Sequence, residues 1–169
     1  MKFLAAHKGK IAFVVIVGIA LVLLPWSIAP EATLPTTLGS LQLTGSHSGQ
    51  YAREMVDRMH DKAVSPTENL IGKYRSPDGE ATLYLSIYES ASEAERDLKK
   101  MVELIRPGGP MLGQFELISV AGHEVASCRG LGQRHYFLSR GKVLYWLAAD
   151  QTVASAAVIR LLESRPGPS

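Results

Sequence analysis

The sequence predicts an α+β protein, in which an N-terminal transmembrane helix precedes one mostly antiparallel sheet with about three helices packed on one face. Three observations support this prediction. An uncharged apolar run occupies residues 11–29, short runs rich in branched and aromatic residues alternate with turn signals, and three further stretches have the apolar spacing of amphipathic helices. Antiparallel strands with separate helices are typical of the α+β class.

The apolar run from Ile11 to Ala29 has the length and the flanks of a membrane anchor. A helix over this range would be roughly 28 Å long at about 1.5 Å per residue, which matches a bilayer core. Lys2, Lys8 and Lys10 precede the run, and the next basic residue is Arg53. This bias predicts a cytoplasmic N-terminus in a bacterial inner membrane, with the remainder of the chain in the periplasm.

A cleaved signal peptide is the alternative interpretation, with secretion after cleavage near Ala29. Pro30 would then follow the cut and make a poor scissile bond. The apolar run also exceeds the ~7–15 residues of a signal core, so a retained signal anchor is favoured. The expected organisation is a short cytoplasmic N-terminus (1–10), the transmembrane helix (11–29), a linker (30–48), an extracytoplasmic α+β domain (49–163) and a disordered tail (164–169).

Charge and cysteine content narrow the function classes. Three of the 18 basic residues precede the apolar run, which leaves 15 basic against 16 acidic residues in the remainder, a net charge of −1. A nearly neutral mixed surface argues against nucleic acid as a partner. The single cysteine cannot form a disulfide within the chain, so packing must stabilise the domain.

Local signals place the elements of the domain. Leu41–Thr44 alternates and suits a short edge strand, Ser48 is a helix cap, and Pro77-Asp78-Gly79 is a hairpin turn. Ser90 with Glu93 forms a capping box before an apolar stripe. The expected elements are a helix over 49–63, strands over 70–75 and 81–88, a helix ending near 106, strands over 115–120, 124–129, 133–139 and 142–149, and a last helix capped by Asp150 or Thr152.

Three residues of the predicted meander are candidate metal ligands. His123, Cys128 and His135 would supply a thiolate and two imidazoles, a donor set suited to zinc or copper, or a Cys–His nucleophile. They come from different strands and a turn, and their spacing does not require them to meet. Free cysteine is usually a buried packing residue, which is the favoured interpretation.

The hairpin sequence Gln133-Arg134-His135-Tyr136 follows two glycines and has an unusual polar composition. One interpretation is a ligand-binding rim, in which the guanidinium and the imidazole recognise a carboxylate or phosphate. The alternative is a glycine-kinked hairpin whose alternate residues face solvent. The second interpretation is favoured, because glycines in strand regions often mark only bulges.

Aromatic side chains recur on three of the predicted strands. They could line an apolar pocket or a protein-binding face, although packing within the core and on the sheet is the favoured interpretation. No phosphate loop, zinc-protease motif, serine-hydrolase elbow or cysteine pair occurs. No cofactor is therefore expected, no catalytic residue is assigned, and a binding protein is favoured over an enzyme. The aromatic residues are Tyr84, Tyr88, Tyr136, Tyr145 and Trp146.

The layout resembles that of bacterial single-pass envelope proteins with an extracytoplasmic α+β domain and no assigned activity. The resemblance lies in Gly49-x-x-Ala52 with Met59-His60, the helix containing Met101, the run from Gly130 to Tyr136, and Trp146-Leu147. It implies a membrane-anchored extracytoplasmic domain and no particular activity. The first hypothesis is that this domain binds another component of the cell envelope. The alternative is a periplasmic domain that uses the Gln133–Tyr136 region for a small ligand, a metal or catalysis.

Overall fold

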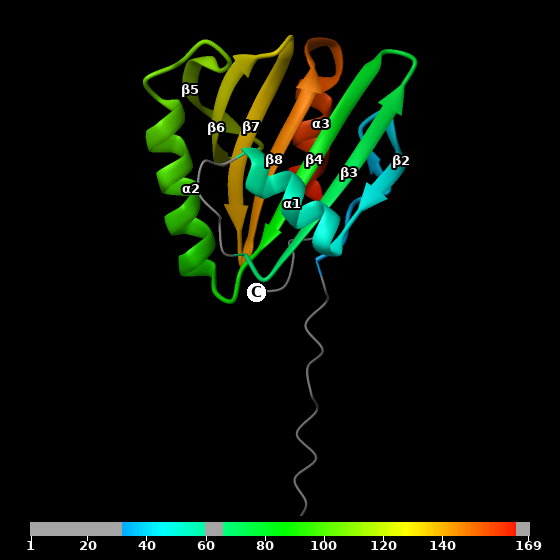
Figure 1. The fold of residues 1–169 in the computed structure, drawn as a ribbon. Helices are drawn as coiled ribbons and strands as arrows, with labels where there is room; N and C mark the ends of the chain where they lie inside the picture. The colour runs from blue at the N-terminus through cyan, green and yellow to red at the C-terminus, as the bar shows by residue number, and fades with distance from the viewer. Residues whose placement is uncertain (1–31, 60–65, 165–169) are drawn as a thin grey trace, which may run out of the picture.

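The computed structural model describes residues 32–59 and 66–164, so the predicted transmembrane helix over 11–29 lies outside the described residues. Within those two ranges, no helix is both long and apolar enough to cross a bilayer. The described chain forms one curled antiparallel sheet with three helices, which confirms the predicted α+β class (Figure 1).

The sheet contains eight strands in the order β1-β2-β3-β4-β8-β7-β6-β5. Each half of the sheet is therefore a meander of consecutive strands, and the two halves meet where β4 pairs with β8. The strands are β1 (Thr37–Leu38), β2 (Leu41–His47), β3 (Glu68–Ser76), β4 (Gly79–Ile87), β5 (Gly113–Val120), β6 (His123–Gly130), β7 (Gln133–Arg140) and β8 (Val143–Asp150). The helices are α1 (Gly49–Met59), α2 (Ala91–Ile105) and α3 (Gln151–Glu163).

Two-residue turns connect the strands of the second meander, at the places where the sequence predicts the chain to reverse but one residue shorter at 121–122 and 131–132 than expected. Ala121-Gly122 and Leu131-Gly132 both have positive φ at each position, with values of 50° and 81° and of 51° and 80°. Two left-handed residues in succession make the tight turn whose twist matches that of the flanking strands. The turns therefore fix the register of β5, β6 and β7.

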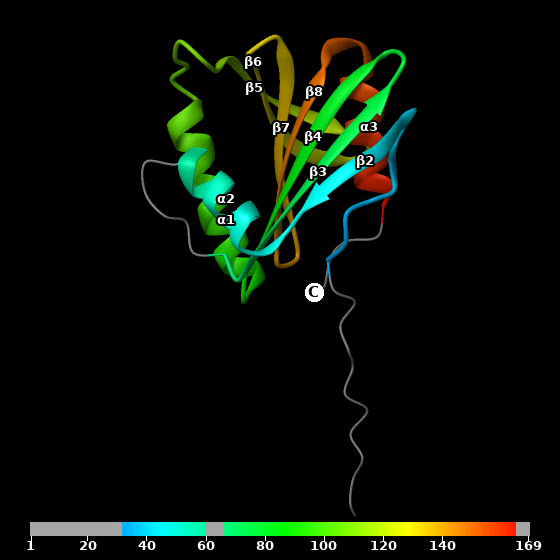
Figure 2. The same ribbon diagram turned by 45° about the vertical axis from the view of Figure 1, so that its right-hand side comes forward.

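The prediction that the helices pack on one face of the sheet is wrong. Helix α3 packs on one face, whereas α1 and α2 pack on the other (Figures 1 and 2). The reason lies in strands β6, β7 and β8, which bury consecutive residues instead of alternate ones. His135 to Leu138 are all buried, for example. A strand that is apolar on both sides needs cover on both sides.

The first residues of the sheet lie within the range expected to be a linker. Residues 37–47 form β1 and β2, and Leu38 and Leu41 are fully buried in the core beneath α3. Ser90 caps α2 as predicted, because its hydroxyl accepts the Glu93 amide at 3.3 Å. Asp150 occupies the cap position of α3, but its carboxylate makes no bond to that helix.

Candidate functional site

The structure separates the four residues of the expected Gln133–Tyr136 rim. Alternate residues of a strand point to opposite faces. Arg134 and Tyr136 belong to the α3 side, where Tyr136 joins the main core, and His135 lies on the α2 side with Phe137. Gln133 donates to the Asp150 carboxylate at 3.1 Å. The four side chains therefore do not converge on one binding site.

Arg134 is engaged within its own sheet. Its Nε donates to Ser127 Oγ at 2.7 Å, and its Nη2 donates to Glu116 Oε2 at 2.7 Å. Its guanidinium carbon also lies 5.9 Å from the centre of the Tyr136 ring. Because these partners occupy the guanidinium, Arg134 joins β7 to β6 and β5 and is not available as an anion clamp.

His135 is buried and uses both ring nitrogens in hydrogen bonds. Trp146 Nε1–H, which can only donate, lies 3.1 Å from Nδ1. Nδ1 must therefore be the acceptor, which places the proton on Nε2, 3.0 Å from the Gly130 carbonyl. The hydrogen bond to His135 thus fixes the orientation of the Trp146 ring.

Burial holds His135 in its neutral form. It lowers the pKa of the imidazole, and the hydrogen bond to the Gly130 carbonyl offsets part of this effect. Protonation would also turn Nδ1 into a donor that faces the Trp146 N–H. A metal ion would have to displace one of the two hydrogen bonds to reach a ring nitrogen. The geometry therefore indicates a structural role for this histidine.

The three candidate metal ligands do not form a cluster. Cys128 lies directly opposite His135 in the β6–β7 ladder, but His123 lies at the far end of β6, where it pairs with Val120 beside the turn. No group of three His, Cys, Asp or Glu side chains suited to a metal occurs in residues 32–59 and 66–164. Burial raises the pKa of the Cys128 thiol, which disfavours the thiolate needed for metal binding or nucleophilic attack.

One continuous apolar row crosses the sheet on its α1–α2 side. Strand register places six residues opposite one another in succession, and we call this set the cross-strand row. It consists of Ile71, Tyr84, Trp146, Phe137, Ala126 and Leu117, from β3, β4, β8, β7, β6 and β5. The order of the chain does not show this row, because β8 and β4 are distant in sequence. In the sequence, only the aromatic residues on these strands indicate such a row.

The helices cover the cross-strand row unevenly. Ile71 is buried on β3, the strand that α1 packs against, and Phe137 and Ala126 are buried on the side of α2. Tyr84 and Trp146, on the two strands between, are only partly buried. Their ring centres are 5.0 Å apart, and Trp146 also contacts Phe137 at 5.5 Å. The Tyr84–Trp146 pair is therefore a partly exposed aromatic surface with a rigid base.

The polar groups of Trp146 and Tyr84 differ in their hydrogen bonding. The Trp146 N–H is occupied by His135. The Tyr84 hydroxyl makes no hydrogen bond to any residue in the described ranges, and burial raises its pKa, so it stays neutral near pH 7. Such a surface offers ring area together with one free hydroxyl, a composition common where proteins bind one another.

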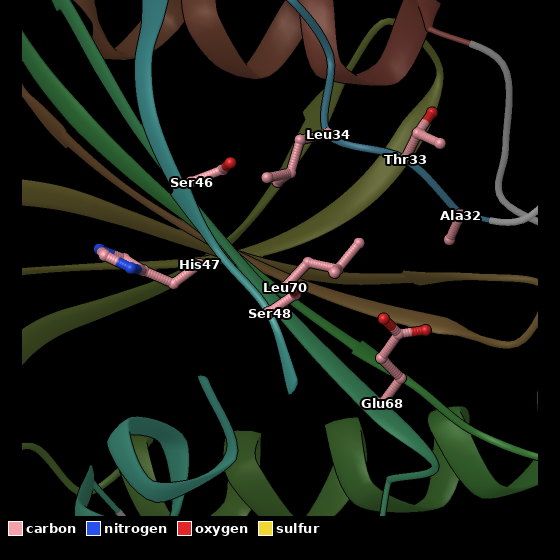
Figure 3. Close-up of a pocket in the computed structure, with 8 residues that line it drawn as sticks. All are labelled: Ala32, Thr33, Leu34, Ser46, His47, Ser48, Glu68 and Leu70. Carbon is pink, nitrogen blue, oxygen red and sulfur yellow. The ribbon is translucent and has the colours of Figure 1, made fainter. Parts of the chain in front are cut away.

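A small hollow lies at the end of β2 (Figure 3). It has a volume of about 280 Å³, and its lining contains Ser46, His47, Ser48 and Glu68 together with apolar residues. The His47 ring points away from the Leu34 side of the hollow and contacts the Tyr51 ring at 4.7 Å. No hydrogen bond joins these polar groups to one another in the described part of the chain. This hollow is at the small end for a ligand pocket and has no catalytic arrangement.

The candidate site is therefore the Tyr84–Trp146 surface, held in place by His135. Of the residues predicted from sequence to bind a ligand, only His135 contributes to it, through Trp146. Arg134, Gln133 and Tyr136 stabilise the sheet instead. No protein-family model, curated protein or solved structure matches the chain.

Proposed function

We propose that the chain is a single-pass inner-membrane protein whose periplasmic α+β domain binds another protein of the cell envelope. The observation that carries this proposal is the partly exposed Tyr84–Trp146 pair on the adjacent strands β4 and β8. Large rings on a rigid base contribute binding energy at low entropic cost. The membrane part of the proposal rests on the apolar run over 11–29 and the lysines before it.

Several features of the described domain favour a protein partner over a small ligand. The accessible aromatic groups lie on strands of a sheet, and the hollow beside β2 is small and open. The polar side chains predicted to bind a ligand are engaged within the sheet. Helix α2 packs against the cluster that includes Phe137 and Trp146 through partly buried apolar residues, namely Leu98, Met101, Val102 and Ile105, and so supports the base of the aromatic pair.

Site-specific photocrosslinking in intact cells tests this proposal. Tyr84→p-benzoylphenylalanine is expected to give an adduct with one envelope protein, because the new ring would lie at the interface. The matched control is the same substitution at Ile159, which is 41% exposed on α3 on the opposite face. An adduct at position 159 but not at 84, or none at either position, would contradict the assignment.

The membrane topology has its own test. Fractionation and determination of the mature N-terminus are expected to place the full-length chain in the membrane fraction. A soluble periplasmic species that begins near Pro30 would show that the segment is cleaved. That outcome would remove the anchor from the proposal and leave the binding surface to be judged by the crosslinking result.

A further inference from the structure

We infer that two copies of this chain pair through strand β5, antiparallel and across a two-fold axis, to form one continuous sheet. This inference goes beyond the proposed function and uses a different surface. β5 is the last strand of the sheet, and within the described residues nothing pairs with its outer side. An exposed edge of this kind is a template for pairing with another strand.

The turn geometry shows which backbone groups face outward. Val120 and His123 flank the two-residue turn and so form a hydrogen-bonded pair. Because hydrogen-bonded and open pairs alternate in an antiparallel ladder, residues 120, 118 and 116 bond to β6. The amides and carbonyls of Leu117 and Ser119 are therefore directed to the free edge, whereas Phe115 lies in the irregular stretch between Gly113 and Glu116. The two residues supply two consecutive sets of hydrogen-bonding groups.

β5 has one feature that protects an edge strand, a register shift between Gly113 and Glu116, and its pairing is regular from Glu116 to Val120. Its sequence, Gly113 to Val120, contains no lysine and no proline, and its one charged residue, Glu116, is paired with Arg134 at 2.7 Å. The opposite edge is different. There the last strand is β1, with only two residues, and β2 has an irregular register between Leu43 and Gly45. The regular part of β5 therefore offers a longer edge for pairing than the two-residue β1 on the other side of the sheet.

Self-complementarity identifies a second copy as the occupant. With the two-fold axis at Leu117, this residue lies opposite its own copy and Glu116 lies opposite Ile118, while Ser119 reaches the start of the irregular stretch at Phe115. The outward-facing groups then bond to each other, and the two carboxylates are not placed face to face. Moving the axis by one residue to Glu116 would set like charges directly opposite, which is unfavourable.

Pairing of two copies would also bury apolar side chains at this edge. Leu117 ends the cross-strand row and is 49% exposed, beyond the cover of α2. In the dimer it would contact the Leu117 of the second copy, so the two rows would join across the axis. Burial of these two exposed leucines adds an apolar contribution to the new backbone hydrogen bonds.

Two pairs of variants of the full-length chain in detergent micelles test the inference. Leu117→Cys is expected to form a disulfide-linked dimer on mild oxidation, because paired Cα atoms about 5.5 Å apart permit a disulfide. Leu117→Lys is expected to weaken dimerisation at least about tenfold in sedimentation analysis, since two lysines would face each other. Leu104, which is 80% exposed on α2, is the matched control, and Leu104→Cys and Leu104→Lys should leave the association unchanged.

Each contrary result overturns the inference. A wild-type chain that sediments as a monomer at micromolar concentration shows that β5 does not pair. A dimer that persists in the Leu117→Lys variant shows association through another surface, such as the apolar N-terminal run. A disulfide from Leu117→Cys to a different protein in cells identifies a heterologous partner. Because Leu117 is half exposed, circular dichroism is expected to show an unchanged fold in its variants.

Discussion

The hydrogen bonds of His135 lead to a quantitative prediction for the His135→Phe variant. Phenylalanine keeps an aromatic ring beside Phe137 and Trp146 but removes both hydrogen bonds. The Trp146 N–H and the Gly130 carbonyl would then lose their partner, and each unsatisfied group costs about 1–3 kcal/mol when buried. Trp146 is only partly buried, so water recovers part of this loss. We expect the free energy of unfolding to fall by about 2–4 kcal/mol near pH 8.

The same variant is expected to change the pH dependence of stability. Burial lowers the pKa of His135 in the folded chain below its ordinary value. Above that ordinary value, about 6.5, the imidazole is neutral in both states and contributes no pH dependence. As the pH falls below about 6.5, the unfolded chain binds a proton that the folded chain does not. The free energy of unfolding then decreases by up to about 1.4 kcal/mol per pH unit, until the folded-state pKa is reached.

Urea unfolding of the full-length chain in mild detergent, at pH 8, 7, 6 and 5, measures both effects. The wild type should lose stability below about pH 6.5 more steeply than His135→Phe. His123→Gln is the matched control for the loss of an imidazole, because His123 is exposed at the β5–β6 turn and makes no hydrogen bond to Trp146. If His135→Phe loses stability with acidification as steeply as the wild type, the argument for a histidine held neutral is refuted.

Three further predictions concern packing in the described domain. Gly130→Ala should lower the free energy of unfolding by at least about 2 kcal/mol in thermal denaturation, because a Cβ at this position would collide with the Met111 carbonyl after α2. Gly45→Ala is the control, because the space around Gly45 is open, and it should change the free energy of unfolding by about 1 kcal/mol or less. Asn69→Val should destabilise by about 1–3 kcal/mol by leaving the buried Ser86 hydroxyl without its acceptor, whereas Asn69→Val with Ser86→Ala should be close to neutral in urea titrations. Cys128 should react with a thiol reagent at least about 100-fold more slowly than in urea, since it is buried and burial raises its thiol pKa; equal rates would contradict this.

The sequence predicted the elements well because their ends carry local signals. Pro77-Asp78, Ala121-Gly122 and Leu131-Gly132 occupy the turns where strands were expected to reverse. The pairing of β4 with β8 has no such signal, since it joins residues about 60 positions apart through side-chain fit alone. Without this pairing, the Tyr84–Trp146 contact could not be predicted.

Strand periodicity bears directly on the predicted Gln133–Tyr136 rim. Consecutive residues of a strand cannot share a face, so Arg134 and His135 could not line one rim. The run Tyr136-Phe137-Leu138, apolar at three successive positions, also indicated a strand covered on both faces. By contrast, the hydrogen bond from Trp146 to His135 depends on the β7–β8 register and the two side-chain rotamers, which sequence does not specify.

The junction between β4 and β8 also determines the order in which the domain can be completed. The first meander, through β4, is synthesised well before β8, the strand that pairs with it, and α3 follows later still. A growing chain therefore carries the open edge of β4 and an uncovered core until residues 143–163 are available. Loss of these residues would remove a central strand and the helix over the main core together. For this domain, truncation before residue 143 should abolish folding as a whole and not merely shorten the sheet.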